Sequence, residues 1–293
     1  MVDKSIVTIS LDFELHFGLR KNTIEYYNLH KLGFFTKEKY LKRINKLINL
    51  IMENEIRMTW AILTKMLTSD DDLCKSVVGE LQDLVDIGQD VCSHSHTHCE
   101  YSSITKDLAQ RDLQLSIKLL RKVLGVNTKC FIYPRSKIRY IDVLIENGIE
   151  VTRTPPWNVY GIGIVSLIDE RMYVRKIISK LMNVSSGYMH KFIIKRKRVV
   201  MVPYSIHIFH ATRYSVRNQV VRCFRILDRI VKQGGILHIV LHDYSLITEE
   251  DLNIFATLIR KISNLRRRKA LTVLPLSKYS RFIPVNVGGE EED

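Results

Sequence analysis

The chain has 293 residues, of which 46% are hydrophobic and 26% are charged, and its formal net charge is +14. This composition fits one large domain or two small ones with a sizeable core, and it excludes a disordered or fibrous protein. The N-terminal apolar run is short and interrupted, and no apolar stretch of about 18 residues occurs, so we expect neither a signal peptide nor a membrane span. We therefore predict a soluble, cytoplasmic protein.

Strands and helices are predicted to alternate along the chain. The predicted strands are residues 5–12, 57–63, 90–95, 130–134, 149–154, 199–209, 236–242 and 271–276. The predicted helices are residues 36–54, 70–87, 105–124, 138–147, 216–233 and 249–268. Such alternation is typical of an α/β protein in which βαβ units surround a parallel sheet, either open or closed into a barrel.

Residues 156–200 interrupt this alternation, and we interpret them as a basic insertion with a helix near residues 171–182. Residues 284–293 have the composition of a disordered tail. Because no internal repeat or low-complexity linker is present, residues 1–283 are predicted to form a single domain.

The positive charge is uneven along the sequence. Residues 171–200 contain nine Lys or Arg and no Asp or Glu, and a second basic run covers residues 266–269. Such surfaces attract nucleic acid, anionic glycans or anionic lipid, although a basic run is more often an ordinary solvated face. We expect no nucleic-acid partner, and we regard peripheral binding to an anionic membrane surface as an open alternative.

The cysteine pattern argues against a cysteine-based framework. The chain has five cysteines, and no two of them are spaced as a CxxC pair. This odd number predicts neither a disulfide scaffold nor a cysteine zinc module, and it favours a reducing compartment.

Titratable residues gather where the predicted strands end, which is where parallel α/β folds keep their functional sites. Asp12 and Glu14 follow the first strand and are only two positions apart. Close carboxylates repel unless a metal or a proton separates them. We therefore expect one of them to bind a metal and the other to act as a base, and a chance surface pair is the alternative.

His94, His96 and His98 end a later strand. In a turn, a spacing of four residues brings the His94 and His98 imidazoles to one side, and with one carboxylate they would form a three-ligand site. Three ligands that leave room for water are typical of catalytic zinc. A surface histidine cluster is the alternative, and His96 would point away if the segment were extended.

A further histidine pair lies on the apolar strand near the C-terminus. His242 is at the strand exit and is the better catalytic candidate, whereas His238 is interpreted as structural. His207 and His210 could belong to the core or lie near the site, and they receive no role.

These residues resemble the motifs of the polysaccharide deacetylases of the NodB-homology type, carbohydrate esterase family 4. Residues 10–14 resemble a variant of the first motif in which base and ligand are one residue further apart, and His94 to His98 match the second motif. Residues 131–136, with Tyr133, Pro134 and Arg135, resemble a Phe-Pro-Arg branch of the third. Trp157 could fill the Trp position of the fourth, where no Asp stands in the expected place, and Leu241-His242 match the fifth.

The resemblance implies a distorted (β/α) barrel of about seven parallel strands and a divalent metal, most often zinc. It implies that Glu14, His94 and His98 hold the metal, that Asp12 is the base and that His242 is the acid. Arg135 would orient Asp12. The Tyr133 backbone N–H would stabilise the oxyanion, and Trp157 would line the substrate pocket or belong to the core.

The implied activity is hydrolysis of an N-acetyl group on an amino sugar or glycan precursor. Two alternatives stay open from the sequence. The same fold could hydrolyse a small non-sugar amide or cyclic imide, in some relatives without a metal. A non-catalytic protein that binds anions or nucleic acid would explain the positive charge instead.

Overall fold

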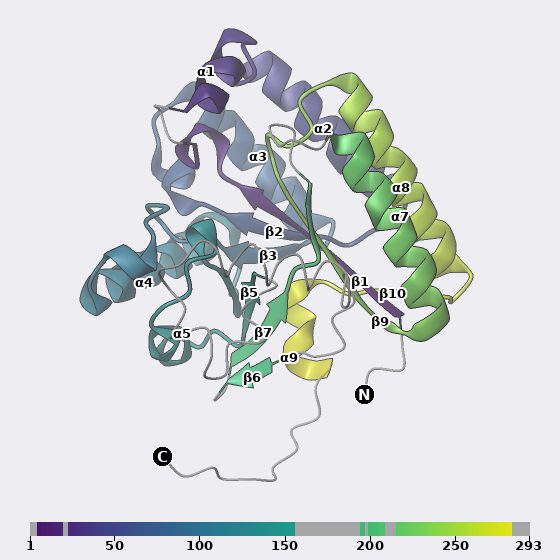
Figure 1. The fold of residues 1–293 in the computed structure, drawn as a ribbon. Coiled ribbons are helices and arrows are strands. Elements are labelled where there is room, and N and C mark those ends of the chain that lie inside the picture. Colours follow the sequence, from purple (N-terminus) through teal and green to yellow (C-terminus); the bar gives the residue numbers. More distant parts are fainter. Residues whose placement is uncertain (1–4, 20–22, 156–193, 197–198, 209–214, 283–293) are drawn as a thin grey trace, which may run out of the picture.

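The computed structural model describes residues 5–19, 23–155, 194–196, 199–208 and 215–282, and Figure 1 shows their arrangement. The strands are β1 Ser5–Phe13, β2 Thr59–Ile62, β3 Asp90–Ser93, β4 Cys130–Ile132, β5 Val151–Thr154, β6 Ile194–Arg196, β7 Val199–Pro203, β8 Ile206–Ile208, β9 Gly235–His242 and β10 Thr272–Val273. The α-helices are α1 Ile24–Lys31, α2 Lys37–Glu53, α3 Asp72–Asp86, α4 Lys106–Leu124, α5 Ile141–Glu146, α7 Val216–Gln233, α8 Glu249–Arg267 and α9 Tyr279–Phe282.

The strands form one sheet in the order β6-β7-β5-β4-β3-β2-β1-β9-β8, and β10 pairs with the start of β1. All pairs are parallel except β6 with β7. The predicted strand 199–209 is two strands in the structure, separated by Tyr204 and Ser205. Its first half pairs with β5 and its second half with β9, so this one segment joins both sides of the curved sheet.

The register of the central strands positions the site. In β1, the residues from Ser5 to Asp12 pair in parallel with those from Gly235 to His242 in β9, which places Asp12 beside His242. On its other side Asp12 pairs with Ala61 of β2, and Ile62 of β2 pairs with Ser93 of β3. The ends of β1, β3 and β9 therefore meet at one edge of the sheet, as parallel strands require.

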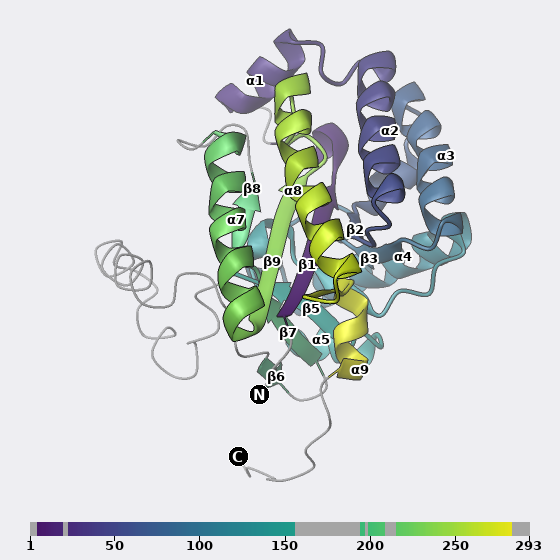
Figure 2. The same cartoon turned by 90° about the vertical axis from the view of Figure 1, so that its right-hand side faces the viewer.

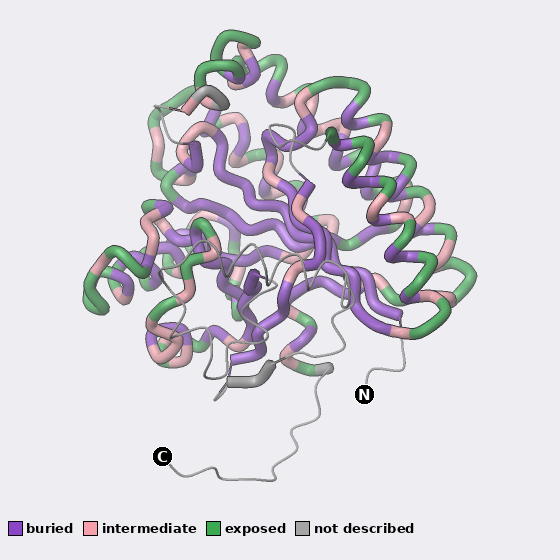
Figure 3. The backbone as a smooth tube through the Cα atoms, viewed as in Figure 1, coloured by how far each residue is buried: buried purple, intermediate pink, exposed green. Residues whose placement is uncertain are grey.

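The helices cover the outer face of the sheet, and Figure 2 shows α2, α3, α7 and α8 standing side by side over it. Their apolar faces are buried, as on α7, where Val220, Cys223 and Leu227 lie inward. A separate cluster of buried hydrophobic residues includes Ile6 and Ile236 from the sheet, together with Leu276 and Tyr279 from the C-terminal segment. Figure 3 shows the strands buried along most of their length while the outer helix faces stay exposed. This is the amphipathic pattern from which the helices were predicted.

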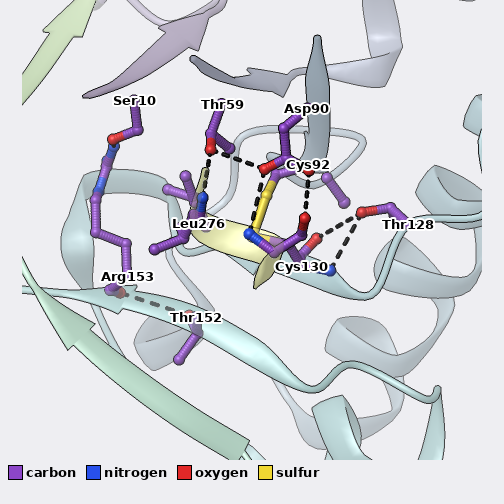
Figure 4. The surroundings of a disulfide bond; sticks show 12 residues. Ser10, Thr59, Asp90, Cys92, Thr128, Cys130, Thr152, Arg153 and Leu276 are labelled. Carbon is purple, nitrogen blue, oxygen red and sulfur yellow. Dashed lines mark hydrogen bonds between the residues drawn. A yellow bond between two sulfur atoms is a disulfide. The ribbon is translucent and has the colours of Figure 1, made fainter. Parts of the chain in front are cut away.

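A disulfide between Cys92 of β3 and Cys130 of β4 corrects the expectation from the cysteine count (Figure 4). Both residues are fully buried. Counting cysteines cannot reveal such a pair, because the two become neighbours only when β3 and β4 align. Disulfides persist mainly in oxidising compartments.

Several elements differ from the prediction. Helix α1 was not predicted, and α5 is shorter than the expected 138–147 because Tyr140 adopts a left-handed conformation (φ 55°) at its start. Residues 156–193, which hold most of the proposed insertion, and the tail at 284–293 lie outside the described residues. Among the helices that the structure describes, none is long and apolar enough to span a membrane.

Candidate metal centre and active site

Glu14, His94 and His98 converge at the edge where β1 and β3 end. Oε1 of Glu14 lies 2.8 Å from Nε2 of His94 and 2.9 Å from Nε2 of His98. All three side chains are almost completely buried. Each residue offers one ligand atom to a single point, and the structure thus brings together the three ligands predicted from the sequence.

Further contacts fix these three side chains. Nδ1 of His94 donates to the carbonyl oxygen of Ile132 at 2.8 Å, which leaves the lone pair of Nε2 for a metal in the neutral ring. The Tyr244 hydroxyl donates to Oε2 of Glu14 at 2.9 Å, so only Oε1 faces the imidazoles. Such outer contacts are typical of metal ligands.

Electrostatics at this point favour a cation. Burial alone would raise the pKa of the Glu14 carboxyl, but His98 and His242 and the hydrogen bonds from His94 and His98 hold it well below its usual range. Burial would lower the pKa of the His94 imidazole, yet the Asp12 and Glu14 carboxylates raise it. The buried negative charge therefore needs a compensating positive charge, from a proton or a metal ion.

Gly18 lies directly against the Glu14 carboxylate. A Cβ atom at this position would lie 1.6 Å from Oε2 of Glu14 and 2.4 Å from its Cδ. The backbone of Gly18 is ordinary for any residue, with φ of −75°. Glycine is needed here for space and not for backbone freedom, because the chain turns back over the side chain of Glu14.

The fit of the donor set to zinc is good. Two imidazole nitrogens and one carboxylate oxygen are a common catalytic zinc set, and the hydrogen bond from Nδ1 of His94 sets its tautomer. A second group, Asp12, Glu14 and His242, also lies close together. It fits a metal less well because Arg153 already occupies both oxygens of Asp12.

Asp12 is bound by Arg153 and not by Arg135, which corrects the sequence prediction. Nη1 and Nη2 of Arg153 donate to Oδ1 and Oδ2 of Asp12, each at 2.6 Å. Burial would raise the pKa of Asp12, but the charges of Arg153 and His94 hold it well below its usual value. Arg135 instead lies 3.4 Å from Glu100 and donates weakly to the Gly18 carbonyl at 3.5 Å.

Arg153 was overlooked because it belongs to none of the motifs and lies inside a predicted strand, between Thr152 and Thr154. It is only 4% exposed in β5. An arginine inside a strand of a parallel sheet is itself a signal, because such strands are buried and an arginine is rarely buried without a partner.

His242 lies beside both carboxylates. Its Nε2 is 3.7 Å from Oδ2 of Asp12 and 3.8 Å from Oε1 of Glu14. Its Nδ1 is 3.0 Å from Nε2 of His207, a residue that received no role from the sequence. Burial lowers the pKa of His242, and burial together with the charge of His242 lowers that of His207 to about 3.

The remaining predicted residues have different outcomes. The Tyr133 side chain is buried and its hydroxyl donates to the Arg139 carbonyl at 2.8 Å, so only the main chain of Tyr133 could face a substrate. Trp157 lies outside the described residues. Nδ1 of His96 contacts the Thr64 hydroxyl at 3.3 Å, and His238 packs below the site with Nε2 at 2.9 Å from Ser10 Oγ.

Comparison with known proteins places this geometry in context. Residues 38–150 match the family model described as polysaccharide deacetylase. No curated protein sequence matches the chain.

Solved structures share the fold at low sequence identity. A candidate polysaccharide deacetylase from Mycobacterium smegmatis is 12% identical, with a TM-score of 0.67 over 97% of this chain and 91% of that chain. The carbohydrate esterase family 4 domain of a xylanase from the hindgut metagenome of Trinervitermes trinervoides is 12% identical, with a TM-score of 0.52 over 97% and 94%. A family 4 pseudoenzyme from Bacillus anthracis is 11% identical, with a TM-score of 0.52 over 96% and 66%.

The predicted α/β fold and the resemblance to the polysaccharide deacetylases are confirmed by these matches. The pseudoenzyme shows that the fold alone does not ensure activity, and a mutant of that protein is described as having restored activity. The side chains at the site must therefore support any statement about chemistry.

Proposed function

We propose that this chain, related to the polysaccharide deacetylases through residues 38–150 and through its fold, is a metal-dependent hydrolase that removes an N-acetyl group from an amino sugar or glycan precursor. The observation that carries the proposal is the meeting of Glu14, His94 and His98 beside Asp12 and His242. A metal-ligand set, an ionised carboxylate and an imidazole at one point are the groups that amide hydrolysis requires.

The metal would be held by Glu14, His94 and His98. A divalent ion, best zinc for this donor set, would supply a Lewis acid that polarises the amide carbonyl and lowers the pKa of water. Asp12 would act as the general base, because Arg153 keeps its carboxylate ionised and fixed in direction.

His242 would protonate the departing nitrogen. Its Nε2 faces the site next to Asp12, while Nδ1 is held by His207. Burial lowers the pKa of His242, which makes its protonated ring a stronger acid. Asp12 and His242 come from paired strands, so the base and the acid are fixed relative to each other by the β1–β9 register.

An N-acetylated sugar is the substrate class that the family match favours. We propose it as the class, with the backbone N–H of Tyr133 as a candidate donor to the oxyanion. The enzyme can be incubated with N-acetylated oligosaccharides built from different sugars, and the acetate released from each can be measured. The oligosaccharide that releases acetate fastest identifies the member of the class.

The test begins with the metal. His94→Ala and His98→Ala are expected to lose stoichiometric zinc, because each removes one of three ligands, whereas Asp12→Asn is expected to keep zinc and lose turnover. His96→Ala is the matched control from the same loop and is expected to keep zinc, since its side chain contacts Thr64 and not Glu14. Atomic emission measures the zinc content of each variant, and acetate release measures its turnover.

Full zinc content in both His94→Ala and His98→Ala would refute the ligand assignment. Zinc binding by the wild type without release of acetate from any N-acetylated sugar would instead refute the substrate class and leave the metal centre standing.

A further inference from the structure

A buried carboxylate outside the site holds the loop that carries the two histidines. Asp112 lies in the middle of α4, is 8% exposed and points toward residues 95–98. Its Oδ1 accepts hydrogen bonds from the Thr97 backbone N–H at 2.9 Å and from the Thr97 hydroxyl at 2.7 Å. Its Oδ2 accepts from the His96 backbone N–H at 3.1 Å and from the Tyr101 hydroxyl at 3.0 Å.

This arrangement is unusual for a helix interior. A buried carboxylate is unfavourable unless it is paired and hydrogen-bonded. Within the part of the chain that the structure describes, no lysine or arginine forms an ion pair with Asp112, and four hydrogen bonds take the place of a counter-charge. Three of these four come from His96 and Thr97, two of the three residues that lie between the histidine ligands.

The loop needs such an anchor because its backbone is strained. Ser95 and His98 both have left-handed backbone conformations, with φ of 68° and 59°, which residues other than glycine rarely adopt. The His98 N–H is capped by Ser95 Oγ at 3.0 Å, and the Thr64 N–H donates to the Ser95 carbonyl at 3.1 Å. Together these contacts turn the chain so that His98 faces back toward His94.

We propose that Asp112 is a positioning residue for the metal centre, which fixes the 95–98 loop in its strained conformation before the metal binds. This inference rests on the proposed function, because a preformed loop raises the metal affinity only if His94 and His98 are metal ligands. Residues that orient metal ligands without touching the metal commonly affect its affinity in this way.

The decisive variant is Asp112→Asn, compared with Asp107→Asn, which alters an exposed carboxylate in the first turn of the same helix. The asparagine amide keeps the shape of the side chain but turns an NH₂ group toward donors. We expect the zinc dissociation constant of Asp112→Asn, measured by competition with a chromophoric chelator, to rise about ten- to hundredfold. The dissociation constant of Asp107→Asn is expected to stay at the wild-type value.

Tyr101→Phe removes one of the four hydrogen bonds and is a milder second variant if Asp112→Asn folds poorly. Its zinc affinity is expected to fall between those of the wild type and Asp112→Asn. Hydrogen exchange at the His96 and Thr97 amides of the zinc-free protein measures directly how well the conformation of the loop is held before metal binds. These amides should be protected in the wild type and in Asp107→Asn, and should exchange faster in Asp112→Asn.

Wild-type zinc affinity in a folded Asp112→Asn would overturn the inference, as would a loss of thermal stability with no change in affinity. Failure of the wild type itself to bind zinc would refute the metal centre. In that case the exchange of the two amides still decides whether Asp112 anchors the loop.

Discussion

Asp12 and Glu14 leave the same strand two residues apart, yet the fold gives them different partners. Arg153 binds both oxygens of Asp12, whereas Glu14 meets two imidazoles and the Tyr244 hydroxyl. A fixed guanidinium keeps a carboxylate ionised, and converging nitrogen donors create a cation site. The two carboxylates thus differ in their neighbours, which is the difference on which the roles proposed for them depend.

Arg153→Met is expected to reduce turnover strongly, because Asp12 loses the charge that opposes its desolvation and its pKa rises. Since the base works only when ionised, the acidic limb of the pH–rate profile should move to higher pH. Arg135→Met is the matched comparison and should leave that limb near its wild-type position. Profiles of kcat/KM against pH test this, and Arg153→Lys, which keeps the charge, should recover part of the rate.

Equal shifts of the acidic limb in the Arg153 and Arg135 variants would show that Arg153 has no special role toward Asp12. Because a buried charge left without its partner destabilises the fold by roughly 3–5 kcal/mol, the folded state of Arg153→Met should be verified before its kinetics are compared.

Gly18→Ala is expected to displace Glu14 and weaken zinc binding, because the added methyl group would lie 1.6 Å from the carboxylate oxygen. Gly79→Ala is the control: this glycine is exposed in α3, and nothing lies within 4 Å of an added Cβ. That substitution should stabilise the helix by about 0.5–1 kcal/mol. Zinc titration and thermal unfolding distinguish the Gly18 and Gly79 variants. Unchanged zinc affinity in Gly18→Ala would contradict the close packing of Gly18 against the Glu14 carboxylate.

At the scale of whole elements, the helices with a strong amphipathic pattern were predictable. Residues 216–233 form α7 as expected, and residues 36–54 were predicted for the helix that spans Lys37–Glu53. The local motifs likewise located Glu14, His94 and His98, because their spacing and their position at strand ends carry the signal.

Residues that reach the site through strand register could not be predicted in the same way. Arg153 and His207 are distant in sequence from the side chains they bind, whereas Asp112 binds a loop from the neighbouring helix. Their roles depend on which strands become neighbours and on which face of a helix turns inward. The division of residues 199–208 into β7 and β8 has the same cause, because the sequence does not show that the two halves pair with different strands.

The Cys92–Cys130 disulfide reinforces a short ladder, since β3 and β4 pair only through Ser93 and Phe131. Its removal by Cys130→Ser is expected to lower the free energy of unfolding by about 2–4 kcal/mol. Cys99→Ser is the control, because Cys99 is a half-buried free thiol. Urea unfolding without reductant measures both, and equal stabilities of Cys130→Ser and the wild type would indicate that the bond contributes little.

At the scale of the molecule, α8 separates charge along its axis. Its first turn carries Glu249, Glu250 and Asp251 on the side of the site, because it follows β9. Its last turn and the residues after it, up to Lys269, are basic and lead into β10 beside the start of β1. The basic end of α8 therefore lies at the opposite end of the helix from its acidic first turn, as the course of α8 in Figure 2 shows.

The pairing of β1 with β9 also has a consequence for biosynthesis. The contact between Glu14 and Tyr244 spans 230 residues of sequence, and Asp12 meets His242 through the same two strands. While the ribosome is still making the middle of the chain, the first strand lacks the β9 neighbour with which it pairs in the folded protein. Asp12 and His242 can therefore meet only after most of the polypeptide has been made.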